Sequence, residues 1–113
     1  MTDRAKILIV EDEKNQRTLL RRTLEKQGYA VEEAESGLDA VTKFEQSDYD
    51  MVLLDQRLPD MTGTEVLTRI RGTNPIVPVI IVTAFANVRD AVDAMRNGAF
   101  HYLTKPVDIE ELL

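Results

Sequence analysis

The sequence predicts an α/β fold in which five parallel strands form a doubly wound sheet with the order 2-1-3-4-5. Short runs of β-branched residues and leucine recur at 7–10, 51–54 and 79–82, and runs that are apolar throughout are typical of strands buried on both faces. Segments whose apolar residues have helical spacing separate these runs. Right-handed crossovers restrict such a series of strand–helix units to a doubly wound sheet.

The first half of the chain contains two strand–helix units. The run at 7–10 precedes a helix that carries Leu20 and Leu24 four residues apart. Gly28 stands where a glycine that caps the carboxyl end of this helix is expected, and a weaker strand follows at 30–34. The apolar residues of the second helix are Leu38, Val41 and Phe44.

The second half continues the alternation. The strand at 51–54 precedes a third helix, which ends at Asn74-Pro75 because proline cannot continue a helix. The strand at 79–82 precedes a fourth helix, and Gly98 stands at its carboxyl end. The helical apolar positions are Val66, Leu67 and Ile70 in the third helix and Val88, Ala91, Val92 and Met95 in the fourth.

A weak fifth strand is expected around 100–103, and a last helix has barely begun at 108–113. We therefore expect a truncated last helix and a single domain, residues 1–113, which is either cut from a longer protein or lacks a disordered tail. A chain of 113 residues with 43% hydrophobic and 30% charged residues is large enough to bury a core and is typical of a folded globular protein.

Composition excludes several classes of site and partner. The chain has no cysteine and only one histidine, His101, which excludes disulfides, thiolate metal sites and histidine clusters. A net charge of −6 argues against direct nucleic acid binding by this domain. The sequence has neither a signal peptide nor a run of membrane-spanning length, so we expect a cytoplasmic protein with no membrane contact.

Polar residues follow the apolar runs at the carboxyl ends of the predicted strands. Glu11-Asp12 closes the first strand, Asp55 the third and Thr83 the fourth, and Lys105 lies just past the fifth. Open α/β sheets bind ligands at the edge where the carboxyl ends of their strands meet. We therefore expect these side chains to form one site.

The charges of this predicted site favour a divalent cation. Glu11, Asp12 and Asp55 contribute three negative charges and Lys105 one positive charge. Carboxylates packed together raise one another's pKa unless a positive charge intervenes, and a divalent cation brings the sum to zero. Because the donors are all oxygen atoms, we expect Mg²⁺ or Mn²⁺.

The same residues suffice to accept a phosphoryl group. Phosphoryl transfer needs an in-line nucleophile and positive charge around the equatorial oxygens. Asp55 can be the nucleophile, Lys105 and the metal supply positive charge, and the Thr83 hydroxyl can donate to a phosphoryl oxygen. The sequence contains no Gly-x-x-x-x-Gly-Lys-Ser/Thr loop, so we do not expect the domain to make the group from ATP.

Segments along nearly the whole chain resemble the receiver domain of bacterial two-component response regulators, which has a flavodoxin-like fold. The matching segments are Ile9–Glu13, Leu53–Gly63, Val82–Ala84 and Tyr102–Pro106. The resemblance implies that Asp55 is the phosphoacceptor of a sensor histidine kinase. It also implies that Asp12 and Asp55 ligate Mg²⁺ directly with the backbone carbonyl of Arg57, while Glu11 acts through water.

The resemblance assigns further roles to the second half of the chain. Lys105 would pair with the phosphoryl group, and Pro106 would follow a cis peptide bond. Thr83 and Tyr102 resemble a switch pair in which the hydroxyl moves to the phosphoryl oxygen and the ring rotates inward behind it. Such catalysis serves the domain's own state, so we do not expect a conventional enzyme.

The implied output lies outside this chain. We expect phosphorylation to change the face formed by the fourth helix, the fifth strand and the fifth helix, and so to control a homodimer or a C-terminal output domain. The segments around Thr83 and Lys105 most resemble receivers of enhancer-binding transcription activators. The basic residues of the first helix are candidates for kinase docking: Lys14, Arg17, Arg21 and Arg22.

Two alternatives use the same fold. A pseudo-receiver would be an interaction module without phosphorylation, but it has no need of the complete acidic, hydroxyl and lysine set. A flavin- or nucleotide-binding domain would want a phosphate loop after the first strand, where Glu11-Asp12-Glu13 would repel a phosphate.

Asp60-Met61-Thr62-Gly63-Thr64 resembles the phosphorylation motif of ion-pumping ATPases, but Asp60 does not follow a buried strand. We interpret that segment as a loop with Gly63 as a turn residue.

One hypothesis concerns the lifetime of the phosphorylated state. Arg57 and Phe85 each lie two residues after a site residue, Asp55 and Thr83 respectively, so they should flank the phosphoryl group. We expect their bulk to hinder the attacking water and to slow hydrolysis.

Overall fold

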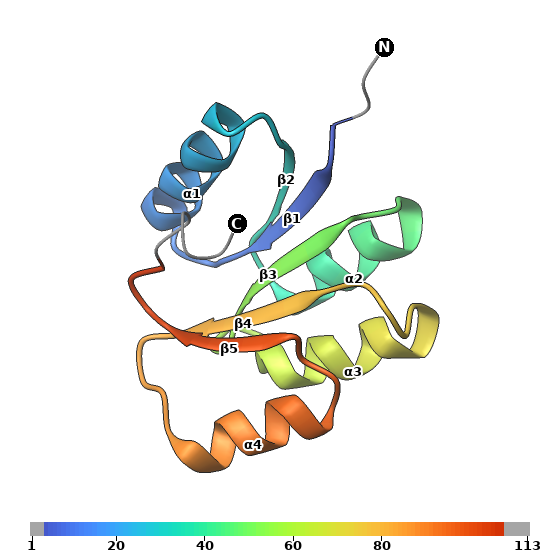
Figure 1. The fold of residues 1–113 in the computed structure, drawn as a ribbon, viewed down its shortest axis with the longest axis vertical. Helices are drawn as coiled ribbons and strands as arrows, with labels where there is room; N and C mark the ends of the chain where they lie inside the picture. Colours follow the sequence, from blue (N-terminus) through green and yellow to red (C-terminus); the bar gives the residue numbers. More distant parts are fainter. Residues whose placement is uncertain (1–3, 108–113) are drawn as a thin grey trace.

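The predicted parallel sheet is present in the computed structural model, which describes residues 4–107. Five strands pair in parallel with the order β2-β1-β3-β4-β5 (Figure 1). Their bounds are Lys6–Val10 for β1, Ala30–Ala34 for β2, Met51–Asp55 for β3, Val79–Thr83 for β4 and His101–Thr104 for β5. The sequence therefore predicted the topology correctly and the strand bounds to within about one residue.

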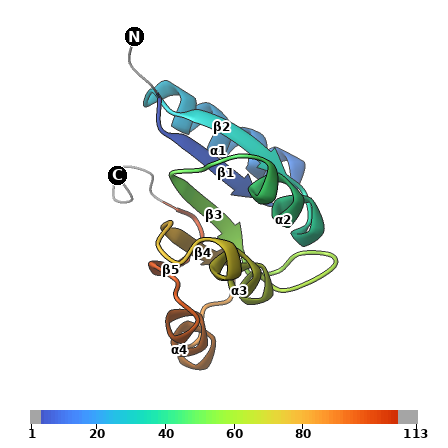
Figure 2. The same cartoon turned by 90° about the vertical axis from the view of Figure 1, so that its right-hand side faces the viewer.

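Helices cover both faces of this sheet. They are α1 (Lys14–Lys26), α2 (Gly37–Gln46), α3 (Gly63–Thr73) and α4 (Val88–Arg96). Figure 2 shows α1 on one side of the strands and α2 and α3 on the other. None of the described helices combines the length and the apolar character that crossing a membrane requires. The last predicted helix, 108–113, lies outside the described residues.

Two hydrophobic cores follow from this layering. Side chains alternate between the faces of a strand, so Leu8 and Val10 join the core beneath α2 and α3, whereas Ile7 and Ile9 join the core beneath α1. All four are almost completely buried, and each such burial stabilises the fold by about 1.5–3 kcal/mol relative to exposure. Because both faces of β1 are buried, its continuous apolar run is explained.

The helix ends match their sequence signals. Gly28 and Gly98 have φ angles of 96° and 100°, in the left-handed region that glycine enters at little cost. Glu13 caps the amino end of α1, where its carboxylate accepts hydrogen bonds from the backbone N–H groups of Asn15 and Gln16. Asn74 is the C-cap of α3, as the Asn74-Pro75 pair predicted.

The apolar spacing of α4 correctly predicted a helix, but most of its apolar residues do not face the core. Val88, Val92 and Met95 are 80%, 42% and 49% exposed, whereas Ala94 is fully buried. The helix approaches the core through this small side chain, and its larger apolar residues lie on the outer surface. Leu38 of α2 is likewise exposed.

Candidate functional site

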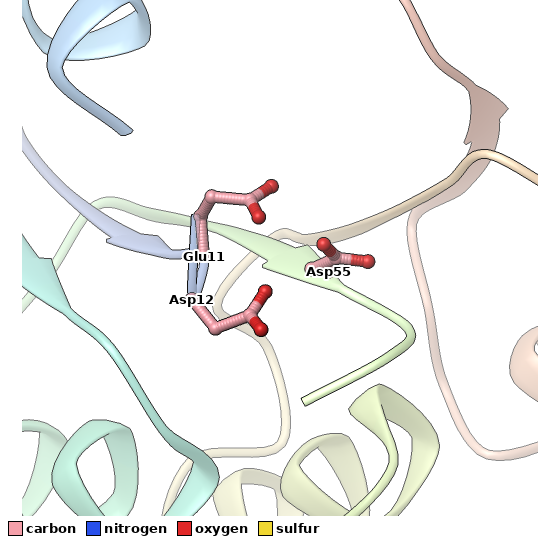
Figure 3. A group of neighbouring side chains, drawn as sticks. All are labelled: Glu11, Asp12 and Asp55. Carbon is pink, nitrogen blue, oxygen red and sulfur yellow. The ribbon is translucent and has the colours of Figure 1, made fainter. Parts of the chain in front are cut away.

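The predicted acidic residues meet at the carboxyl edge of the sheet. Val10 of β1 pairs with Leu54 of β3, so Glu11 and Asp55, the next residue on each strand, leave the sheet side by side. Figure 3 shows the side chains of Glu11 and Asp12 extending from the end of β1 toward Asp55. One carboxylate oxygen from each of the three lies within 4.8 Å of the other two.

Burial distinguishes the members of this cluster. Glu11, Asp55 and Thr83 are 3%, 7% and 2% exposed and are the buried polar residues of the described chain, whereas Asp12 is exposed. A buried carboxylate is costly unless it is paired or hydrogen-bonded. The partner that satisfies the two buried carboxylates must therefore come from elsewhere in the sheet edge.

Lys105 is that partner. Its Nζ donates to Glu11 Oε2 at 2.7 Å and to Asp55 Oδ2 at 2.8 Å, and to Gln16 Oε1 on α1 at 3.0 Å. Burial lowers the pKa of Lys105, but the hydrogen bonds to Asp55 and Glu11 outweigh it, so the pKa lies above its ordinary value. The ammonium is thus held in its charged form between two carboxylates.

The surroundings of the buried Glu11 carboxylate disfavour its charged form. Burial is the main cause that raises the pKa of Glu11 above its ordinary value, and the charge of Asp55 adds to it. The hydrogen bonds from Lys105 and from the backbone N–H of Glu13 act in the opposite direction. The site therefore favours additional positive charge, which would relieve the repulsion between the carboxylates.

Arg17 holds the backbone of Glu11 in place through a hydrogen bond. Its Nη1 donates to the carbonyl oxygen of Glu11 at 2.7 Å, and its Nε donates to Glu33 Oε1 at 3.0 Å. Arg21 also binds Glu33 through an ion pair. Two of the four basic residues considered for kinase docking are thus engaged within the domain.

The loop after β3 approaches Asp55 closely. The backbone N–H of Arg57 donates to Asp55 Oδ1 at 3.1 Å. A Cβ atom on Gly63 would lie 2.6 Å from the carbonyl oxygen of Asp55, and Gly63 is the first residue of α3 with no positive φ. The interpretation of Gly63 as a turn residue was therefore wrong, because glycine is needed there for close packing.

Arg57 and Phe85 form a bridge beside Asp55. The guanidinium carbon of Arg57 lies 4.5 Å from the centre of the Phe85 ring, a distance typical of a cation–π interaction. The backbone N–H of Phe85 donates to Thr83 Oγ1 at 3.2 Å. The loops that follow β3 and β4 are therefore joined by their side chains next to the buried Asp55 and Thr83.

Tyr102 lies on β5, the neighbour of the strand that ends at Thr83, and Pro106 follows β5 directly after Lys105. Tyr102 pairs in register with Ile81 and packs against the core beneath α3. Its hydroxyl oxygen is buried, and no hydrogen-bond partner occurs for it within residues 4–107. Burial is the main cause that raises its pKa, followed by Asp90. The peptide bond between Lys105 and Pro106 is cis.

The donor set fits a small hard cation. All three clustered side chains offer oxygen atoms, which are the ligands that Mg²⁺ and Mn²⁺ prefer. Sequence reasoning identified these donors and Lys105, but it missed the contact of Gln16 with Lys105 and the contact of Arg17 with Glu11. The signal for both was their place in the first turn of the helix that follows Glu11-Asp12.

Comparison with known proteins gives consistent matches along the chain. Residues 7–113 match the response regulator receiver domain family. The transcriptional regulatory protein ZraR of Klebsiella oxytoca is 42% identical over 106 residues, which are 94% of this chain and 24% of that protein. The chain thus spans about a quarter of the length of this relative.

Solved structures agree with the sequence matches. A response regulator receiver domain protein (CheY-like) from Methanospirillum hungatei JF-1 has a TM-score of 0.93 and 34% identity over 97% of this chain and 88% of that chain. The response regulator TrrA of Thermotoga maritima, solved in complex with Mg²⁺-BeF, has a TM-score of 0.86 and 35% identity over 96% and 92% of the two chains.

Proposed function

The chain belongs to the response regulator receiver domain family, and on that basis we propose that it accepts a phosphoryl group on Asp55 from a sensor histidine kinase. The observation that supports this most directly is the position of Asp55. It is a buried carboxylate at a strand end, in contact with Lys105 and within 4.8 Å of two further carboxylates. A structural aspartate needs no such surroundings.

The reaction is a transfer between two nucleophiles. A carboxylate oxygen of Asp55 attacks phosphorus, the P–N bond of the kinase phosphohistidine breaks, and the electron pair remains on the departing imidazole nitrogen. Lys105 holds positive charge beside the phosphoryl oxygens, where charge concentrates during transfer. The Thr83 hydroxyl, now an acceptor for the Phe85 N–H, can donate its own proton to a phosphoryl oxygen.

We propose Asp12, Asp55 and the Arg57 carbonyl as direct ligands of Mg²⁺ or Mn²⁺, with Glu11 acting through water. When bound, the metal supplies positive charge that stabilises the equatorial oxygens. Glu11 adds negative charge beside these ligands, and its two carboxylate oxygens accept hydrogen bonds from Lys105 and from the Glu13 N–H. The complex of TrrA with Mg²⁺-BeF, at 35% identity, supports a metal ion at this site.

We further propose that Thr83 and Tyr102 report the phosphorylation state. The buried hydroxyl of Tyr102, without a partner among the described residues, costs about 1–3 kcal/mol. An inward ring is therefore stabilised by packing but opposed by its hydroxyl, and a small change at Thr83 can shift the balance between two ring positions. The change would reach the outer face of α4 and β5.

The transcriptional regulator ZraR of Klebsiella oxytoca is longer than this chain, which matches 24% of its length. We propose that residues 1–113 form one receiver domain that controls a C-terminal output domain, by analogy with the longer transcriptional regulators that it resembles, and that phosphorylation promotes a homodimer through the α4–β5 face. The segments that resemble receivers of enhancer-binding transcription activators favour an output domain of that type. Kinase docking would use the exposed side of α1, where Lys14 and Arg22 lie.

The test is the intact mass after incubation with Mg²⁺ and a small phosphodonor. We expect a single phosphoryl adduct in the wild type, and none in Asp55→Asn or after removal of the metal. Asp48→Asn is the matched control, because Asp48 is an exposed aspartate before β3, at the other end of the strand. If the wild type forms neither an adduct nor a beryllofluoride complex, the phosphoacceptor proposal is wrong, and a pseudo-receiver explains the fold better.

A further inference from the structure

The loop that joins β3 to α3, residues 56–62, is fastened at its base. The Gly63 N–H donates to the carbonyl oxygen of Gln56 at 2.8 Å. The Gln56 side chain accepts a hydrogen bond from the Thr64 N–H at 3.0 Å, and Arg57 and Thr62 form an isolated antiparallel bridge. These contacts close the loop into a narrow hairpin that carries Arg57 beside Asp55.

The tip of the same loop is fastened to a different helix. Asp60 Oδ1 accepts a hydrogen bond from the Gly37 N–H at 2.8 Å, and Oδ2 accepts one from the Leu38 N–H at 2.9 Å. Both donors belong to the first turn of α2, whose N–H groups have no partner within the helix. These two hydrogen bonds, led by that from Leu38, hold the pKa of Asp60 below its ordinary value. Asp60 is thus a second cap of α2, beside Ser36, which accepts from Asp39.

Packing adds to this attachment. A Cβ atom on Gly37 would lie 2.2 Å from Met61 Cγ and 2.6 Å from Met61 Sδ, so the methionine lies directly against the helix backbone. Met61 also packs against the core that contains Ala40 and Phe44 of α2. The loop tip is therefore held by hydrogen bonds at Asp60 and by close contact at Met61.

We propose that Asp60 is a positioning residue for the metal site: by binding the amino end of α2, it holds the loop so that the Arg57 carbonyl faces the acidic cluster. This inference rests on the proposed function, in which that carbonyl is a ligand. Pro59 lies between the two residues and restricts the backbone, so the position of the tip is transmitted to Arg57. A loop that is already ordered loses less conformational entropy when a ligand binds.

Thermodynamic linkage predicts that Mg²⁺ also stabilises the attachment of the loop to α2. If the α2 attachment favours metal binding, then metal binding must favour the attachment by the same factor. Mg²⁺ is therefore expected to slow hydrogen exchange at the amides of Gly37 and Leu38, although neither residue belongs to the acidic cluster. The amide of Asp39, which donates to Ser36, serves as the internal reference.

The test compares two variants that each remove one cap from α2. Asp60→Ala removes the cap that comes from the loop, and Ser36→Ala removes the cap that comes from the helix's own N-cap residue. Both are expected to lower Tm, since both leave N–H groups of the first turn without acceptors. The Mg²⁺ dissociation constant, measured by calorimetric titration, separates them: we expect it to rise about tenfold in Asp60→Ala, at the low end for lost outer-shell support, and to stay at the wild-type value in Ser36→Ala.

The results of these measurements distinguish a positioning role of Asp60 from an effect on helix stability alone. An unchanged Mg²⁺ affinity in Asp60→Ala, or an equal loss in both variants, would overturn the positioning role, because the second result would reflect helix stability alone. If Asp60→Ala does not fold, the exchange measurement on the wild type decides, and equal effects of Mg²⁺ on the Leu38 and Asp39 amides would contradict the proposal. A wild type that does not bind Mg²⁺ would instead refute the proposed metal site itself.

Discussion

Replacing Gly63 by alanine tests whether close packing behind the phosphoacceptor limits both stability and function. The added Cβ would lie 2.6 Å from the Asp55 carbonyl oxygen, 2.9 Å from Gln56 Oε1 and 3.0 Å from Gln56 Cα. Ordinary van der Waals contacts begin at about 3.4 Å. Two of these three atoms, the Asp55 carbonyl oxygen and Gln56 Cα, belong to the main chain. The strand end or the start of α3 must therefore move.

The expected cost follows from that geometry. Forcing an extra carbon into a packed site typically costs about 1–3 kcal/mol, which lowers Tm by roughly 4 to 15 °C for a domain of this size. The strand end that the new Cβ would press against carries the phosphoacceptor Asp55, so we also expect slower formation of the phosphoryl adduct. Denaturant unfolding gives the free-energy change, and intact mass against time gives the rate.

Gly72→Ala is the matched control within the same helix. No atom lies within 4 Å of a Cβ built on Gly72, and alanine is favoured over glycine in a helix by about 0.5–1 kcal/mol. The same substitution in α3 should therefore stabilise at residue 72 and destabilise at residue 63. A Gly63→Ala protein as stable as the wild type would show that the loop yields freely, and the packing argument would be wrong.

Three further predictions concern the charged groups around the site. Arg57→Ser combined with Phe85→Ser should speed loss of the phosphoryl group, because the cation–π bridge beside Asp55 no longer hinders the attacking water; an unchanged hydrolysis rate, followed by mass, would contradict this. Glu33→Gln should lower stability at pH 7 by about 1 kcal/mol. Burial raises the pKa of Glu33, but the hydrogen bonds from Arg21 and Arg17 leave it below its ordinary value, so the folded state binds protons less readily than the unfolded state. The stabilisation is therefore complete above the ordinary pKa and is lost as pH falls through the folded value, and denaturation curves of the two proteins should converge in acid. Lys105→Met should abolish adduct formation, yet Mg²⁺ should raise its Tm more than that of the wild type, because the buried carboxylates then lack their internal cation; a smaller Tm rise in the variant would refute the charge argument.

The fold was predictable because its signals are local. The apolar runs at 7–10, 51–54 and 79–82 and the glycines at Gly28 and Gly98 are visible within a few residues. The position of the acidic cluster followed from one geometric rule, that parallel strands end at a common edge. Neither inference requires knowing which residues touch across the chain.

The contacts that support the site were not predictable in this way. Asp60 binds the backbone of Gly37 and Leu38, more than twenty residues earlier, and a backbone N–H carries no sequence signature. Arg17 was counted with the basic surface of α1, yet it binds the Glu11 carbonyl. A basic residue one turn into a helix fits either role, and only the path of the preceding loop decides between them.

The side of α4 that faces the core was not predictable from local spacing either. Helical spacing shows that Val88, Val92 and Met95 share a side of the helix, but it does not say whether that side meets the core. Ala94, with a smaller apolar side chain, is the buried residue. Amphipathic spacing therefore identified the helix correctly but left its buried side open.

These supporting contacts indicate how the domain keeps like charges together. Arg17 holds the carbonyl of Glu11, Lys105 holds the carboxylates of Glu11 and Asp55, and Asp60 holds the loop of Arg57 to α2. Each attaches a different segment of the sheet edge to a different element, so no single contact has to offset the whole repulsion. A site arranged in this way can exchange one cation for another without unfolding, because separate contacts outside the carboxylates hold the backbone of Glu11 and the loop of Arg57.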